Sequence, residues 1–112
     1  MKTLITSNEP RISSQMDLRF GRAKWFCIYD HETDDIQFIE NMHADAQGGA
    51  GVKIAEMTAG LGVSRVMSGH FGPKAKEILD KFDIQLIEVA DEVSVETLIQ
   101  NINNNSKQKL NI

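Results

Sequence analysis

Short apolar runs alternate with polar breaks along the first forty residues, and this pattern predicts three β-strands. Residues 2–6 (KTLIT) are rich in β-branched side chains and end at the turn-prone Ser-Asn-Glu-Pro. Residues 24–29 (KWFCIY) are apolar on both alternating faces, which is typical of a strand covered on both sides. Residues 36–40 (IQFIE) follow a brief polar break, so 24–40 is predicted to form an antiparallel hairpin.

From residue 48 onward the apolar period becomes helical, with short strands between the helices. Ile54, Met57 and Leu61 lie at helical spacing, and Gly62 follows as a stop signal. Pro73 fits the first position of the next helix, where a missing N–H is harmless. The predicted elements are a helix over 52–61, a strand over 64–67, a helix over 73–82, a strand over 84–89 and a helix over 95–102 with Ser94 as its N-cap.

The last two predicted helices each present one apolar face. The face of the helix over 73–82 consists of Ala75, Ile78, Leu79 and Phe82. The face of the helix over 95–102 consists of Val95, Leu98, Ile99 and Ile102. Both faces are expected to pack on the sheet.

The order β-β-β-α-β-α-β-α predicts an α/β fold with one mixed sheet, because right-handed βαβ crossovers put helices on both of its faces. If the first strand lies between the hairpin and the later strands, three loops meet at one edge: 7–23, 41–51 and 68–73. The acidic turn at His31 then lies at the opposite edge. The shared edge is expected to gather Arg19, Arg22, His43, the glycines within 48–51, His70 and Gly72.

Length and charge place limits on the class of protein. A chain of 112 residues with 41% hydrophobic content fits one domain, expected over 1–102 with a frayed tail over 103–112. The net charge of −4 disfavours binding to nucleic acid or to an anionic membrane. The charge is uneven, since 11–24 hold four basic residues against Asp17 alone, while 30–45 hold six acidic residues and no Lys or Arg.

The apolar segments and the cysteine content of the sequence predict where the protein is located and whether it forms a disulfide. No apolar run approaches the roughly 20 residues of a membrane span, and 1–10 lack the apolar segment of a secretion signal. The sequence therefore predicts a cytoplasmic protein. Cys27 is the only cysteine, so an internal disulfide and a Cys-x-x-Cys motif are excluded. Its position within an apolar strand predicts a small buried hydrophobe.

The shared edge has features of an anion site. The glycine stretches 48–51 and 69–72 each precede a predicted helix, where free N–H groups and the positive end of the helix dipole favour negative charge. Arg19, Arg22 and Lys74 would add positive charge. The glycines fit tight turns equally well, and neither stretch is a dinucleotide or P-loop fingerprint.

Two histidines are candidate metal ligands at the same edge. His43 and His70 can bind a soft or borderline metal, and each also fits a solvated loop histidine. The methionines near this edge, at 16, 42 and 67, are expected mostly in the core. A catalytic function is not indicated, because the acidic residues cluster at the hairpin turn and over 83–96, away from the first strand.

Three segments carry a family resemblance: DLRFGRAKWFCIYD over 17–30, the glycines within 48–51, and SGHFGPKAKEIL over 68–79. Together they resemble the dinitrogenase iron-molybdenum cofactor biosynthesis family, small domains that bind or carry metal-cluster precursors. The resemblance runs from about residue 2 to 102. Its most specific part is Phe20-Gly21-Arg22-Ala23 followed by Phe26, and the second is Gly69-x-x-Gly72-Pro73-Lys74-Ala75. It implies a ribonuclease-H-like, three-layer fold with strand order 3-2-1-4-5.

The resemblance also implies a noncatalytic carrier of an anionic iron-sulfur or iron-molybdenum type cluster, exchanged with a donor or acceptor protein. Many members carry His before the first Phe-Gly, where this chain has Arg19; arginine attracts an anion but does not ordinarily coordinate metal. The expected cofactor-binding residues are Arg19, Phe20, Gly21, Arg22, Gly48, Gly49, Gly51, Gly69, Gly72 and Lys74, with His70 and His43 as metal ligands. The alternative is a metal-free regulatory or interaction module that binds a small anion or a partner protein at this edge.

Overall fold

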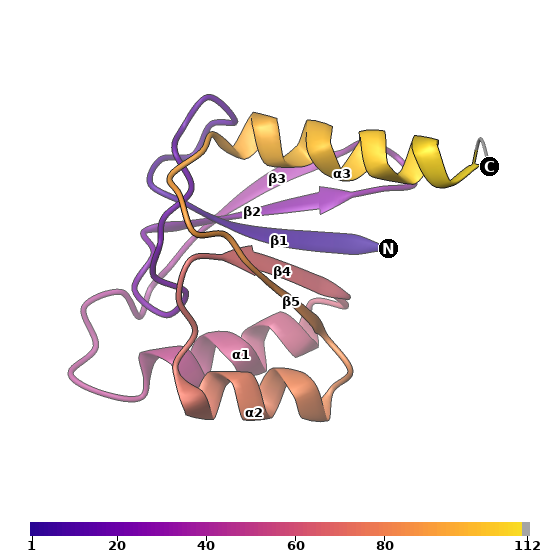
Figure 1. Cartoon of the computed structure of the whole chain (residues 1–112). Helices are drawn as coiled ribbons and strands as arrows, with labels where there is room; N and C mark the ends of the chain where they lie inside the picture. Colours follow the sequence, from indigo (N-terminus) through magenta and orange to yellow (C-terminus); the bar gives the residue numbers. More distant parts are fainter. Residues whose placement is uncertain (111–112) are drawn as a thin grey trace.

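Five strands and three helices fold into a mixed sheet with helices on both faces (Figure 1). The computed structural model describes the backbone of residues 1–110 and the side chains of residues 1–104. The elements are β1 (Lys2–Ser7), β2 (Trp25–Asp30), β3 (Ile36–Glu40), α1 (Ala50–Gly60), β4 (Arg65–Ser68), α2 (Pro73–Lys81), β5 (Gln85–Glu88) and α3 (Val95–Leu110).

The first strand lies at the centre of the sheet. The strand order is β3-β2-β1-β4-β5, as the family resemblance implied. β1 pairs antiparallel with β2, where Ile5 lies opposite Cys27, and parallel with β4, where Ile5 lies opposite Met67. β2 and β3 form the predicted antiparallel hairpin.

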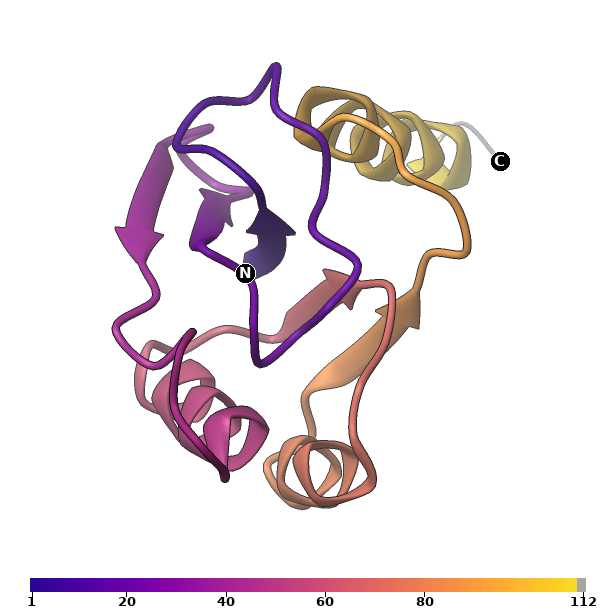
Figure 2. The same ribbon diagram turned by 90° about the vertical axis from the view of Figure 1, so that its left-hand side faces the viewer.

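Each face of the sheet has its own hydrophobic core. Successive residues of a strand point to opposite faces, so Leu4 and Ile5 of β1 belong to different cores. The core around Leu4 lies beneath α1 and α2, and the core around Ile5 lies beneath α3 (Figures 1 and 2). The predicted arrangement of helices on both faces is confirmed.

The helices differ from prediction mainly at their ends. α2 begins at Pro73 as predicted, but it ends at Lys81, and Phe82 just beyond it is 55% exposed. The prediction that Phe82 packs in the core is therefore wrong, because the chain turns away through Asp83 at a left-handed φ of 58°. The Oγ of Ser94 accepts the N–H of Thr97 at 3.1 Å, which confirms the predicted N-cap of α3.

The third helix is longer than expected. Its backbone is helical to Leu110, beyond the predicted end at residue 102. Fraying of the 103–112 tail stays a prediction, and residues 111 and 112 lie outside the described part of the chain. Among the described residues, none of the helices combines the length and the apolar content that a bilayer crossing requires.

The sulfur-containing side chains are distributed between core and surface. Cys27 is fully buried, and burial raises the pKa of its thiol to about 12, which confirms the predicted core position. Met16 and Met67 are also buried. Met42 is 80% exposed, so the expectation of a core role does not hold for it.

Candidate functional site

Three loops meet at one edge of the sheet, as predicted, and we call this edge the rim. It lies where β1, β3 and β4 end and β2 begins, at the left of Figure 1 and facing the viewer in Figure 2. A pocket of about 310 Å³ opens there. Its walls are formed by Arg19, Phe20, Gly21, Arg22, Gly49, Ala50, Gly51, His70 and Gly72. We call it the rim pocket.

A second pocket adjoins the first between the starts of α1 and α2. It has a volume of about 380 Å³, shares Gly49, Gly51 and Gly72 with the rim pocket, and reaches Lys74. A larger pocket of about 490 Å³ lies between the far ends of the same helices, beside Phe82. The candidate ligands predicted from the sequence lie at the rim and not at this larger pocket.

The two Phe-Gly sequences lie side by side at the rim. The N–H of Phe20 donates to the carbonyl of His70 at 3.1 Å, and the N–H of His70 donates to the carbonyl of Leu18 at 2.7 Å. The Phe20 and Phe71 rings pack with centroids 5.1 Å apart. Phe20 is buried in the core and also belongs to the wall of the rim pocket, so its expected part in cofactor binding stays a prediction.

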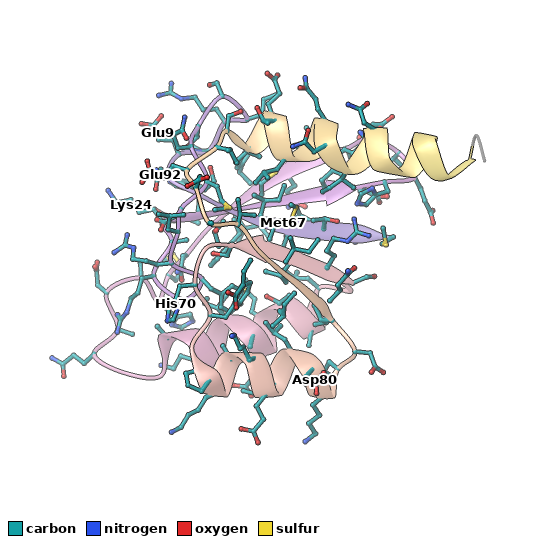
Figure 3. The ribbon with its side chains drawn as sticks, in the orientation of Figure 1. Glu9, Lys24, Met67, His70, Asp80 and Glu92 are labelled. Atoms are coloured by element: carbon teal, nitrogen blue, oxygen red, sulfur yellow. The ribbon has the colours of Figure 1, made fainter. Side chains whose placement is uncertain are left out.

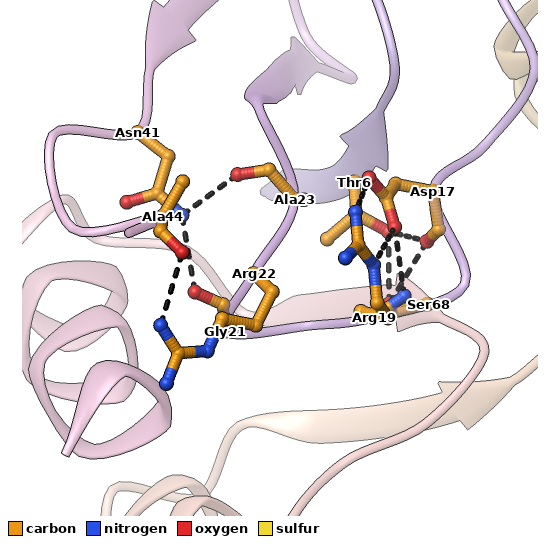
Figure 4. A network of polar contacts seen from close by, with 9 residues as sticks. All are labelled: Thr6, Asp17, Arg19, Gly21, Arg22, Ala23, Asn41, Ala44 and Ser68. Atoms are coloured by element: carbon orange, nitrogen blue, oxygen red, sulfur yellow. Dashed lines mark hydrogen bonds and ion pairs between the residues drawn. The ribbon is translucent and has the colours of Figure 1, made fainter. Parts of the chain in front are cut away.

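A buried carboxylate holds Arg19. Asp17 is only 4% exposed and accepts hydrogen bonds from the backbone N–H of Arg19 at 3.0 Å and from its guanidinium at 3.3 Å (Figure 4). The hydroxyls of Thr6 and Ser68 donate to the Asp17 carbonyl, which fixes this turn. The hydrogen bond that the Arg19 guanidinium donates to Asp17, followed by the negative charge of Asp17, raises the pKa of the guanidinium. Arg19 therefore brings less net charge to the rim than expected.

Arg22 and Asn41 join two loops in a reciprocal way. Nη1 of Arg22 donates to the carbonyl of Ala44 at 3.0 Å and also to the carbonyl of Ala46. In return, Nδ2 of Asn41 donates to the carbonyls of Gly21 at 3.1 Å and Ala23 at 2.7 Å (Figure 4). We call this arrangement the reciprocal clamp. Sequence reasoning missed Asn41, whose only signal was its place at the end of a predicted strand.

The starts of α1 and α2 face the rim without capping side chains. Their N-cap residues are Gly49, at a left-handed φ of 71°, and Gly72, and neither first turn contains an acidic residue. The two helices approach closely, since a Cβ on Gly51 would lie 3.5 Å from that of Ala75. Gly21 packs on α1 so tightly that a Cβ there would lie 2.7 Å from the Gly51 nitrogen. Free N–H groups of both helices are therefore directed to the rim.

The remaining predicted residues take different places. His70 is exposed and lines the rim pocket (Figure 3), and Lys74 lines the adjoining one. Neither pocket is lined by His43, Gly48 or Gly69. The backbone N–H of His43 donates to the side chain of Asn41, and Gly69 packs against Leu18. Among the described residues, no three His, Cys, Asp or Glu side chains gather as a metal site.

The chain is similar to known structures and to a known family over most of its length. In structure, the chain is similar to the apo orange protein of Desulfovibrio gigas, with a TM-score of 0.86, 26% identity and coverage of 93% of this chain and 88% of that one. It is also similar to a NifB-like protein from Thermotoga, with a TM-score of 0.79, 28% identity and coverage of 92% and 87%.

In sequence, the chain is 27% identical over 94 residues to an uncharacterized protein of Methanocaldococcus jannaschii, covering 81% of this chain and 79% of that protein. Residues 1–105, which include every residue of the rim pocket, match the family described as dinitrogenase iron-molybdenum cofactor. The family and the structural neighbours point to a small cofactor-binding or carrier protein. The chain therefore belongs to the dinitrogenase iron-molybdenum cofactor family.

Proposed function

We propose that this protein is a noncatalytic carrier that holds an anionic iron-sulfur or iron-molybdenum type cluster, or a precursor of one, in the rim pocket. One observation supports this proposal above the others: Arg22, His70 and two uncapped helix starts surround a single pocket in a member of this family. The cluster is the cargo of the protein, which a donor delivers and an acceptor removes.

The charges at the two helix starts favour an anionic cargo. An acidic residue in the first turn usually stabilises a helix by about 0.3–1 kcal/mol, and α1 and α2 both lack one. Their first turns contain lysines instead, Lys53 in α1 and Lys74 and Lys76 in α2, of which Lys76 is paired with Glu88 at 2.9 Å. Bringing two positive helix ends and the two other lysines to one edge is unfavourable for the protein alone. A bound anion would offset that repulsion.

The residues present fit a cluster that carries its own ligands. Within residues 1–104 no three metal-binding side chains converge, so the protein would supply charge and hydrogen bonds, with His70 as the one imidazole at the pocket. The glycines leave room for such a group. A Cβ on Gly49 or Gly72 would meet no atom within 4 Å.

Anaerobic reconstitution with iron, molybdate and sulfide, followed by desalting and metal analysis, tests the proposal. The wild-type protein is expected to retain metal with visible absorbance, and His70→Ala to retain less. His43→Ala is the matched control, because His43 lies on a rim loop but lines neither pocket, so it should behave like wild type. Equal metal retention by His70→Ala and wild type would remove His70 from the site.

A metal-free module that binds a small anion or a partner protein is the second candidate. The single imidazole at the pocket favours it over a site built from several protein ligands. In the same reconstitution this candidate predicts no retained metal in the wild-type protein. It also predicts that a simple oxyanion binds at the rim.

A further inference from the structure

Arg22 has two distinct functions available to it at the rim. Its Nη1 group holds the 41–46 loop through the carbonyls of Ala44 and Ala46, while the residue also lines the rim pocket. A guanidinium presents five N–H donors in a planar fork. Among the described residues, the Nε and Nη2 groups of Arg22 have no hydrogen-bond partner. One side of the fork is therefore occupied by the loop and the other is free.

The free side of the fork has the geometry that suits an oxyanion. Nε–H and one Nη2–H point in parallel and match two oxygens of a carboxylate, phosphate or similar group. Arg19 does not offer the same donors, because its Nε and Nη2 already bind the buried Asp17. Of the two arginines at the pocket, Arg22 is thus the one whose anion-binding side is unoccupied.

The reciprocal clamp restricts where that free side can point. Asn41 fixes the backbone on both sides of Arg22 through the carbonyls of Gly21 and Ala23, and the loop carbonyls fix its guanidinium. A long arginine side chain that is already held loses less conformational freedom when it binds a ligand. The loop thereby prepares Arg22 for an anion.

We propose that Asn41 is a positioning residue for Arg22 and that occupancy of the rim pocket is coupled to the order of the 41–46 loop. The inference rests on the proposed anion-binding function of the rim pocket and deepens it. Because coupling is reciprocal, an anion on the free side of Arg22 tightens the loop, and a loosened loop weakens the binding of the anion.

Titration calorimetry with molybdate, combined with hydrogen exchange of the amides of residues 42–47, tests this coupling. In the wild type, molybdate is expected to bind and to slow exchange in the loop. Asn41→Ala is expected to weaken molybdate binding by roughly tenfold, although Asn41 does not line the pocket. Arg22→Lys keeps the charge but lacks the fork, so it should lose the slowing of exchange. Arg65→Lys, on β4 away from the rim, is the control and should behave like wild type.

Three outcomes separate the two proposals. Molybdate binding to wild type with unchanged loop exchange, or with equal affinity in Asn41→Ala, would overturn the coupling and leave the anion site standing. Absence of molybdate binding to wild type would overturn both. Because Asn41 is buried and its replacement can impair folding, the exchange measurement on Arg22→Lys decides the question independently: persistent slowing of loop exchange in that variant overturns the role of the fork.

Discussion

The Arg19–Gly21 segment and the His70–Gly72 segment have nearly the same sequence and lie beside each other, yet their surroundings differ. Both phenylalanines are buried and in contact. Arg19 is bound to a buried carboxylate, whereas His70 is exposed at the pocket. Gly21 is crowded by the backbone of α1, whereas Gly72 has open space around it. One segment fixes the architecture of the rim, and the other presents a free side chain at it.

Replacing either phenylalanine has the largest expected effect and tests what the segments share. Phe20→Ala and Phe71→Ala should each lower the free energy of unfolding by about 3–5 kcal/mol, because each leaves a cavity in the same core. The double variant should lose less than the sum, by about 0.5–1.5 kcal/mol, since the rings contact each other. Urea denaturation measures all three. Full additivity would mean that the two segments do not act as one unit.

Replacing the two glycines tests where the segments differ. Gly21→Ala should cost about 1–3 kcal/mol, because its Cβ would lie 2.7 Å from the Gly51 nitrogen and 2.8 Å from the Gly51 Cα. Gly72→Ala should change stability by less than about 0.5 kcal/mol, because its φ of −66° suits alanine and no atom lies within 4 Å. Denaturation of the pair under the same conditions measures this contrast, and equal losses would contradict it.

Removing Asp17 tests how Arg19 is held. Asp17→Ala should lower the free energy of unfolding by about 1–3 kcal/mol, since the backbone N–H of Arg19 loses its acceptor and the turn loosens. Asp45→Ala, an exposed acidic residue on the 41–46 loop, is the control and should have little effect. A loss for Asp17→Ala no greater than for the control would show that the Arg19 turn is held by its backbone alone.

Exchanging the first residue of one segment for that of the other should change stability less than the replacements of Phe20, Gly21 or Asp17. Arg19→His should alter the free energy of unfolding by less than about 1 kcal/mol, because the Arg19 side chain is 62% exposed and the buried Asp17 carboxylate keeps its hydrogen bond from the backbone N–H at position 19. It adds a second imidazole beside His70, so metal retained after reconstitution should increase. Metal analysis beside wild type and Arg19→Lys measures this, and no increase would argue against coordination at position 19.

Much of the fold was predictable because the apolar periods and the glycine and proline positions agree with one another. The strand runs, the hairpin and the starts of the helices at Pro73 and after Ser94 follow from local preferences that the structure keeps. The meeting of three loops at one edge followed from the position of β1 in the sheet. The strand order alone therefore explains why Arg22, Gly49 and His70 line the same pocket.

The electrostatics of the rim were not predictable in the same way. The local excess of positive charge over 11–24 includes Arg19 as an unpaired cation. Nothing in the sequence indicates that Asp17 is buried and accepts hydrogen bonds from the Arg19 guanidinium. Arg22 binds backbone carbonyls, which every residue has, so its partners leave no signature. Asn41 was missed for the same reason. Such contacts depend on how the chain turns at each loop and not on residue type.

The central position of β1 has a consequence for how the chain assembles. β1 is synthesised well before its parallel neighbour β4, which begins only at Arg65, so during translation one side of β1 stays unpaired until that segment emerges. Pairing between such distant segments is slower than local pairing. The rim pocket takes its walls from residues before and after this pairing, Arg19 to Arg22 and His70 to Gly72, so it cannot be complete until residue 72 has emerged and β4 has paired with β1.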